Sequence, residues 1–320
     1  MKLRAVRHIA EYLAVRIFLA LLQAVSLETC QTVTRWLAWL MADVFRIRGK
    51  IVAENLGIAL PETTEADRTR IARRMWRHLL LMVCETAQIH RKIHETNWRQ
   101  HVQLFNEARW MSLACRRGPK VCVTGHFGNF EALGHISNFW GFRTYTVART
   151  LDNPYLDALV KRFRESKGQR MLPKDNSAGQ AEEVLQTGGI LALLGDQHAS
   201  HGGCVVDFLG RPAACHKAVA LFALLNRAPI MVATCSRADR PLHFRMGMDA
   251  AIEPAENPDE YDSVEALTQW YNDALATRIR QQPDQYWWLH DRWKNVKPRK
   301  RRKRKDAATA IVVEAHRPAA

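Results

Sequence analysis

Short apolar runs alternate with helical patterns from about residue 120 onward, and this alternation constrains the fold more than any other feature of the chain. The runs expected to form strands, each bounded by Gly, Asp or basic residues, are Val121–Thr124, Thr144–Ala148, Ile190–Gly195 and Pro229–Cys235. Strands that alternate with helices favour an α/β domain in which a largely parallel central sheet is flanked by helices.

The intervening helices carry recognisable start and stop signals. Asn153–Pro154 supplies an N-cap and a proline at the first helical position, and Gly168 supplies a stop. Further helices are expected over Thr64–Ile89, Ser177–Gly188 and Lys217–Asn226, and after Ser263.

The positive charge of the chain is distributed unevenly. The 320 residues include 47 Lys+Arg and 32 Asp+Glu, a formal net charge of +15, and the 47% hydrophobic content excludes global disorder and a polytopic membrane protein. Residues 294–320 hold ten basic and two acidic residues, a net +8, which leaves +7 for the rest. The run KPRKRRKRK over 297–305 has three open interpretations: a ligand for anionic lipid headgroups, a non-specific nucleic-acid contact, or a solvated tail. No recognition motif accompanies it, so no specific nucleic-acid binding is expected.

The N-terminal region is apolar but interrupted by charges. Its longest uncharged run, Ile17–Leu27, has 11 residues, whereas a membrane-spanning helix needs about 20. Glu11 and Arg16 interrupt any longer stretch. We therefore expect residues 1–45 to form one or two membrane-associated helices that lie on or dip into a bilayer. The alternative is a buried helix pair of a soluble protein.

One candidate catalytic motif lies at a strand-to-helix turn. The segment GHFGNFE, residues 125–131, places His126 after a predicted strand and Glu131 in the following helix. Such turns are where open α/β sheets carry their sites. An imidazole can take a proton from a hydroxyl, and a carboxylate on its other nitrogen fixes the tautomer. The H-x4-E spacing alone is weak, because His90 and Glu95 match it too, and the alternative is a turn histidine with a surface charge.

A second loop has metal-ligand spacing. His198, His201 and Cys204 follow the pattern H-x2-H-x2-C, with Asp196 and Asp207 nearby. We favour a polar loop beside the active site and expect no metal.

The seven cysteines are scattered and form no C-x-x-C pair, which favours a reducing compartment. Sequences typical of serine hydrolases, P-loop proteins and dinucleotide-binding folds are absent.

The motifs occur in a characteristic order along the chain. HFGNFE is followed by Arg149 with Asn153–Pro154–Tyr155, by Gly195–Asp196–Gln197, by VVDFLG with RPA, and by WLHDRWK at 288–294. Over residues 10–295 this order resembles the lipid A biosynthesis acyltransferases, the lauroyl and myristoyl transferases of the H-x4-[DE] glycerolipid acyltransferase superfamily.

This resemblance implies an acyltransferase domain over 46–295. It is preceded by the membrane-associated segment over 1–45, and the basic, polar composition of residues 296–320 predicts a disordered tail. It implies an enzyme at the cytoplasmic face of the bacterial inner membrane. Such an enzyme moves an acyl chain from an acyl carrier protein thioester, or acyl-CoA, to a hydroxyl of a lipid A precursor, without a cofactor. The family's catalytic pair maps onto His126 and Glu131, and its substrate-binding positions map onto Arg149, Asp196 and Gln197.

The roles around this pair are expected as follows. His126 deprotonates the acceptor hydroxyl, and Glu131 orients His126. Backbone amides around Gly128 and Asn129 stabilise the oxyanion. Arg149 either assists them or binds an acceptor phosphate, which suits a guanidinium. Two alternatives stay open: an acyltransferase acting on a glycerolipid or other lipid, and a non-enzymatic protein that binds anionic membranes or nucleic acid.

Overall fold

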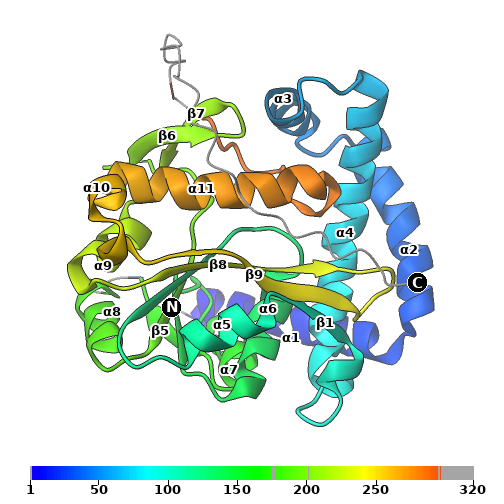
Figure 1. Ribbon diagram of the computed structural model, residues 1–320. Coiled ribbons are helices and arrows are strands. Elements are labelled where there is room, and N and C mark those ends of the chain that lie inside the picture. The colour runs from blue at the N-terminus through cyan, green and yellow to red at the C-terminus, as the bar shows by residue number, and fades with distance from the viewer. Residues whose placement is uncertain (1, 175–176, 201, 295, 297–320) are drawn as a thin grey trace, which may run out of the picture.

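The computed structural model describes residues 2–174, 177–200, 202–294 and 296 (Figure 1). Within these residues, a seven-stranded sheet has the strand order β1-β9-β8-β2-β5-β3-β4, and β6 and β7 form a separate pair. The strands are β1 (Val102–Phe105), β2 (Lys120–Thr124), β3 (Thr144–Ala148), β4 (Arg170–Pro173), β5 (Ile190–Leu194), β6 (Cys204–Phe208), β7 (Arg211–Cys215), β8 (Ile230–Arg237) and β9 (Phe244–Ile252). Every pairing in the large sheet is parallel except β8 with β9, so the predicted α/β class with a largely parallel sheet is confirmed.

Helices surround this sheet. They are α1 (Lys2–Ala24), α2 (Leu27–Trp39), α3 (Gly49–Ala59), α4 (Glu65–Lys92), α5 (Glu107–Ala114), α6 (Phe130–Ser137), α7 (Pro154–Glu165), α8 (Ser177–Gln186), α9 (Ala218–Asn226), α10 (Pro258–Tyr261) and α11 (Val264–Gln281). Short helical turns are η1 (Leu40–Val44), η2 (Trp98–Gln100), η3 (Asn138–Trp140), η4 (Pro254–Glu256) and η5 (Pro283–Gln285). In Figure 1, α11 crosses one face of the sheet, whereas α5 and α6 lie against the other.

The predicted helix starts are confirmed by their caps. The side chain of Asn153 accepts hydrogen bonds from the amides of Tyr155 and Leu156, so α7 begins at Pro154. Thr64 and Asp67 form a reciprocal capping box that starts α4. These local signals fix the helix ends independently of the tertiary structure.

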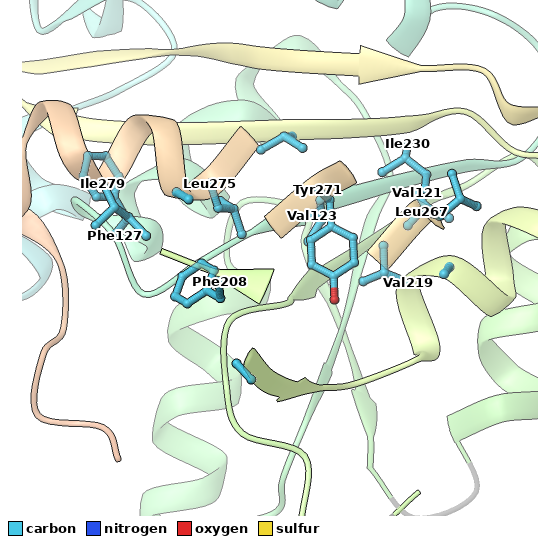
Figure 2. Packing of buried hydrophobic residues seen from close by; sticks show 14 of the residues in the cluster. Val121, Val123, Phe127, Phe208, Val219, Ile230, Leu267, Tyr271, Leu275 and Ile279 are labelled. Atoms are coloured by element: carbon cyan, nitrogen blue, oxygen red, sulfur yellow. The ribbon is translucent and has the colours of Figure 1, made fainter. Parts of the chain in front are cut away.

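Two apolar clusters pack on the two faces of the sheet. Along β8, Ile230 and Val232 belong to one cluster, whereas Met231 and Ala233 belong to the other, as the two-residue period of a strand requires. The first cluster includes Tyr271 of α11 together with residues of β2, and Figure 2 shows part of it. Burial on both faces accounts for the nearly continuous apolar sequence of the central strands.

The β6–β7 hairpin was not predicted from the sequence. These strands pair antiparallel, and the two turn residues, Leu209 and Gly210, have φ of 54° and 91°. Left-handed conformations at both central positions are typical of the two-residue turns that join twisted hairpin strands. Leucine is not a residue that signals such a turn, which is why the pattern escaped prediction.

The N-terminal helices pack against the rest of the chain through polar contacts. The side-chain amide of Gln88 in α4 donates to the carbonyl of Leu22 in α1 at 2.8 Å. The side-chain amide of Asn153 donates to the carbonyl of His8 at 2.9 Å. Among the described residues, no helix is both long enough and apolar enough to cross a membrane. The predicted tail falls almost entirely on residues 297–320, which lie outside the described residues.

Candidate active site

His126 lies in the loop after β2 and is held by Asp196, which follows β5. The imidazole Nδ1 lies 2.8 Å from Oδ1 of Asp196, and the backbone amide of His126 donates to Oδ2 at 2.7 Å. The two strands are parallel neighbours in which Thr124 pairs with Leu194. Because parallel neighbours end at the same edge of a sheet, the residues that follow them meet there. One carboxylate thus fixes both the backbone and the ring of the histidine.

The charges of this pair support each other. Burial lowers the pKa of His126, but the charge and hydrogen bond of Asp196 outweigh it, so that the pKa lies above the ordinary histidine value. Burial raises the pKa of Asp196, which is 2% exposed, but the charge and hydrogen bonds of His126 lower it below its usual range. Near neutral pH the carboxylate is therefore ionised and accepts from Nδ1–H.

This tautomer leaves the lone pair of His126 on Nε2. The side chain of His126 is 17% exposed, so Nε2 is accessible to a small group such as a hydroxyl. The side-chain amide nitrogen of Gln197 lies 3.3 Å from it. The arrangement suits a general base: an imidazole oriented at Nδ1 whose Nε2 carries a lone pair.

Glu131 is bonded to Arg164 and not to His126, which differs from the prediction that it orients His126. Its two oxygens accept from Nε and Nη2 of Arg164 in α7 at 3.1 and 2.5 Å. Glu131 lies in the first turn of α6, from which its side chain reaches α7, and its charge contributes to the raised pKa of His126. The orienting position thus belongs to Asp196, and the catalytic role of Glu131 stays a prediction. Arg164 was not anticipated, and no sequence signal separates it from the other basic residues of its helix.

The backbone amides predicted to bind an oxyanion are already used inside the protein. Gly128 N–H donates to the carbonyl of Gln285 at 2.8 Å, and Asn129 N–H donates to the carbonyl of Cys235 at 2.7 Å. The turn is wedged against β8: Gly128 has φ of 59°, and a Cβ there would lie 2.1 Å from the Cys235 oxygen. This contradicts the expectation that these two amides meet an oxyanion.

A buried polar network holds the other side of the turn. Glu85, which is fully buried in α4, accepts from Nε and Nη2 of Arg237 at 2.6 and 2.7 Å and from the side-chain amide of Asn129 at 3.0 Å. His78, also in α4, contacts the Gly128 carbonyl at 3.0 Å and accepts from Arg237 Nη1 at 2.7 Å. Burial and the Arg237 charge hold the pKa of His78 well below its usual value, so the ring is neutral. In the sequence, this network is indicated only by the polar residues His78 and Glu85 on the apolar face of α4.

The C-terminal aromatic segment closes the site. Trp287 N–H donates to the His126 carbonyl at 3.0 Å, and the two rings meet edge-on with centroids 5.5 Å apart. Trp288 and Trp293 are buried in the core. Trp287 therefore forms a wall of the site, while its neighbours belong to the core.

The remaining predicted residues are placed as follows. Arg149 follows β3 with its side chain 79% exposed and pairs with Asp152 at 3.9 Å. His198 donates its backbone amide to Nε2 of His290 at 2.9 Å. Among the described residues, no group of three His, Cys, Asp or Glu could hold a metal ion, and His201 lies outside them.

The fold and site define a class of protein: an α/β protein with a carboxylate-bonded histidine at the carboxyl edge of its parallel strands. The chain matches the family model for the bacterial lipid A biosynthesis acyltransferases over residues 1–295, and it belongs to this family. It is therefore an acyltransferase. No curated protein matches it. Among solved structures it is similar to the 1-acyl-sn-glycerophosphate acyltransferase PlsC from Thermotoga maritima, with 12% identity, a TM-score of 0.38, and coverage of 82% of this chain and 100% of that chain.

Proposed function

We propose that this enzyme transfers a fatty acyl group from an acyl carrier protein thioester to a hydroxyl of a lipid A precursor, with His126 as the general base. Family membership supports the reaction class. The observation that carries the mechanism is the bond between His126 Nδ1 and the buried carboxylate of Asp196. It presents the Nε2 lone pair to an incoming hydroxyl and stabilises the imidazolium that forms.

The chemistry divides into two steps. The acceptor oxygen attacks the thioester carbonyl carbon while its proton passes to Nε2 of His126, and the carbonyl electron pair moves onto oxygen. The tetrahedral intermediate then collapses, the carbon–sulfur bond breaks, and Nε2 returns the proton to the thiolate. The products are an ester and the thiol of the carrier, and the histidine is regenerated.

The test is transfer of a labelled acyl group by purified protein. We expect His126→Ala to reduce turnover by at least about 10³-fold with an unchanged circular dichroism spectrum, because the base is lost. Mass spectrometry of the product distinguishes a lipid A precursor from a glycerolipid acceptor, and parallel assays with acyl carrier protein and acyl-CoA thioesters identify the donor. Near-wild-type turnover by the His126 variant would exclude this mechanism.

We also propose that the enzyme works at the cytoplasmic face of the bacterial inner membrane and that its N-terminal helices lie on that surface. Exposed apolar side chains repeat at helical spacing on one face of α1: Val6, Ile9, Leu13, Ile17 and Leu21. Further exposed apolar side chains on α2 and η1 are Trp36, Trp39 and Val44. Exposed Arg4, Arg7 and Arg16 accompany them. An apolar row flanked by cations suits an anionic interface, where each basic residue contributes about 1 kcal/mol.

Flotation with vesicles of phosphatidylethanolamine and phosphatidylglycerol tests this surface. We expect Leu13→Glu with Ile17→Glu to lower the vesicle partition coefficient more than about tenfold, because each change places a charge where an apolar group would be buried. Leu225→Glu on α9, which replaces a side chain that is 74% exposed, is the matched control and should bind like the wild type. Equal binding by all three proteins would rule out α1 as the contact.

A further inference from the structure

The donors that surround His126 are mostly committed to other groups. The amide of His126 itself is bonded to Asp196, and the amides of Gly128 and Asn129 are bonded to backbone carbonyls. Arg164 gives two of its N–H groups to Glu131. A tetrahedral intermediate needs a donor about 2.7–3.1 Å from its oxygen, and the donors named here already have partners.

Gln197 supplies a donor at the reacting atom. Its side-chain amide nitrogen lies 3.3 Å from Nε2 of His126, and its side chain is exposed. Because Nδ1–H is bonded to Asp196, Nε2 carries a lone pair and accepts from this amide. A substrate hydroxyl that gives its proton to Nε2 must lie about 2.6–3.2 Å from that nitrogen, and so it takes the place of the amide.

The backbone on both sides of Gln197 is fixed, whereas its side chain is not enclosed. Asp196 is buried and holds His126, and the backbone amide of His198 donates to His290. A displaced Gln197 amide therefore stays beside the reacting carbonyl, since only its side-chain torsions change.

We propose that Gln197 is a further catalytic residue whose side-chain amide donates a hydrogen bond to the oxyanion of the tetrahedral intermediate. This inference rests on the proposed acyl transfer. In the free enzyme the amide occupies the Nε2 lone pair. When the acceptor hydroxyl binds, the amide moves to the thioester carbonyl oxygen. It remains there while the negative charge forms and leaves it when the thiolate departs.

The experiment compares Gln197→Met with Gln186→Met, a matched change of an exposed glutamine at the end of α8. Methionine keeps the length of the side chain and removes the amide. We expect Gln197→Met to lower kcat by about 10²–10³-fold with KM nearly unchanged, because the lost interaction exists only in the transition state. Gln186→Met should turn over like the wild type.

The pH dependence gives a second readout that a merely structural role would not change. A donor to Nε2 favours the neutral imidazole, so its loss should raise the pKa of His126 and move the acidic limb of kcat/KM to higher pH. The charged groups that act on His126, namely Asp196, Glu131 and Arg164, are retained in the variant, and so is the neighbouring titratable His290. A kcat within threefold of an active wild type would overturn the role of Gln197 alone. A wild-type protein without any acyl transfer would overturn the proposed function.

Discussion

Replacement of Asp196 by asparagine is expected to lower kcat for acyl transfer by about 10³–10⁴-fold, the scale seen when the carboxylate of a histidine–carboxylate pair is lost. The side chain is buried, and its two oxygens hold the backbone amide and Nδ1 of His126. Asparagine removes the charge that stabilises the imidazolium. Its amide NH₂ can also face Nδ1 and select the wrong tautomer. Steady-state kinetics with a labelled thioester measures this loss.

The pH profile gives the sign of the effect. The base is active when neutral, and Asp196 raises the pKa of His126. As the pH is lowered, wild-type activity should therefore begin to fall at a higher pH than it would for a histidine with an ordinary pKa. In the asparagine variant, burial still lowers the pKa of His126 and the opposing charge is gone. The acidic limb should therefore move to lower pH while the plateau falls.

Glu131→Gln is the comparison that separates the two carboxylates. It releases Arg164 and removes a more distant charge from His126, but it leaves the bond at Nδ1 intact. We expect a loss smaller than that of the Asp196 variant by at least tenfold. A larger loss for Glu131→Gln than for Asp196→Asn would show that Glu131 carries the orienting role after all.

The position of His126 could be predicted from the sequence, whereas its partner could not. A strand, a glycine-containing turn and a helix start are local features, and each has a residue signal. The contact with Asp196 depends on β2 and β5 being neighbours in the sheet although β3 and β4 separate them in the chain. Strand order is a tertiary property, and it cannot be predicted from the sequence near His126. The nearer Glu131 was therefore predicted.

The hydrogen-bond partners of the turn amides could not be predicted for the same reason. A turn that leads into a helix normally offers free N–H groups, and this made Gly128 and Asn129 reasonable oxyanion donors. Their carbonyl partners come from Cys235 and Gln285, more than 100 residues further along the chain. The polar contacts of Glu85 with Arg237 span a similar separation. In the sequence, Glu85 and Arg237 are recognisable only as charged residues next to apolar segments.

Variants of the buried Glu85–Arg237 pair should distinguish its contribution to the stability of the fold from its contribution to the geometry of the site. Arg237→Met leaves the Glu85 carboxylate buried without its cation, and we expect the free energy of unfolding to fall by about 3–5 kcal/mol. Arg237 also donates to His78, which holds the Gly128 carbonyl, so the loop that carries His126 loses one of its supports. Urea denaturation and steady-state kinetics, measured on the same preparations, report the two effects.

The double variant Glu85→Gln with Arg237→Met is the decisive case, because it removes both charges together. Removal of both members of a buried ion pair is often nearly neutral, so most of the stability should return. We expect kcat to remain at least about tenfold below the wild type, since Gly128 and Asn129 are no longer held in the same way. Arg278→Met, which breaks the buried pair with Asp249 between α11 and β9, is the matched control: it should destabilise the fold and leave kcat near the wild type. If the double variant regained full kcat along with its stability, the network would serve the fold alone. If kcat stays low although the protein is stable, the Glu85–Arg237 network serves to align His126.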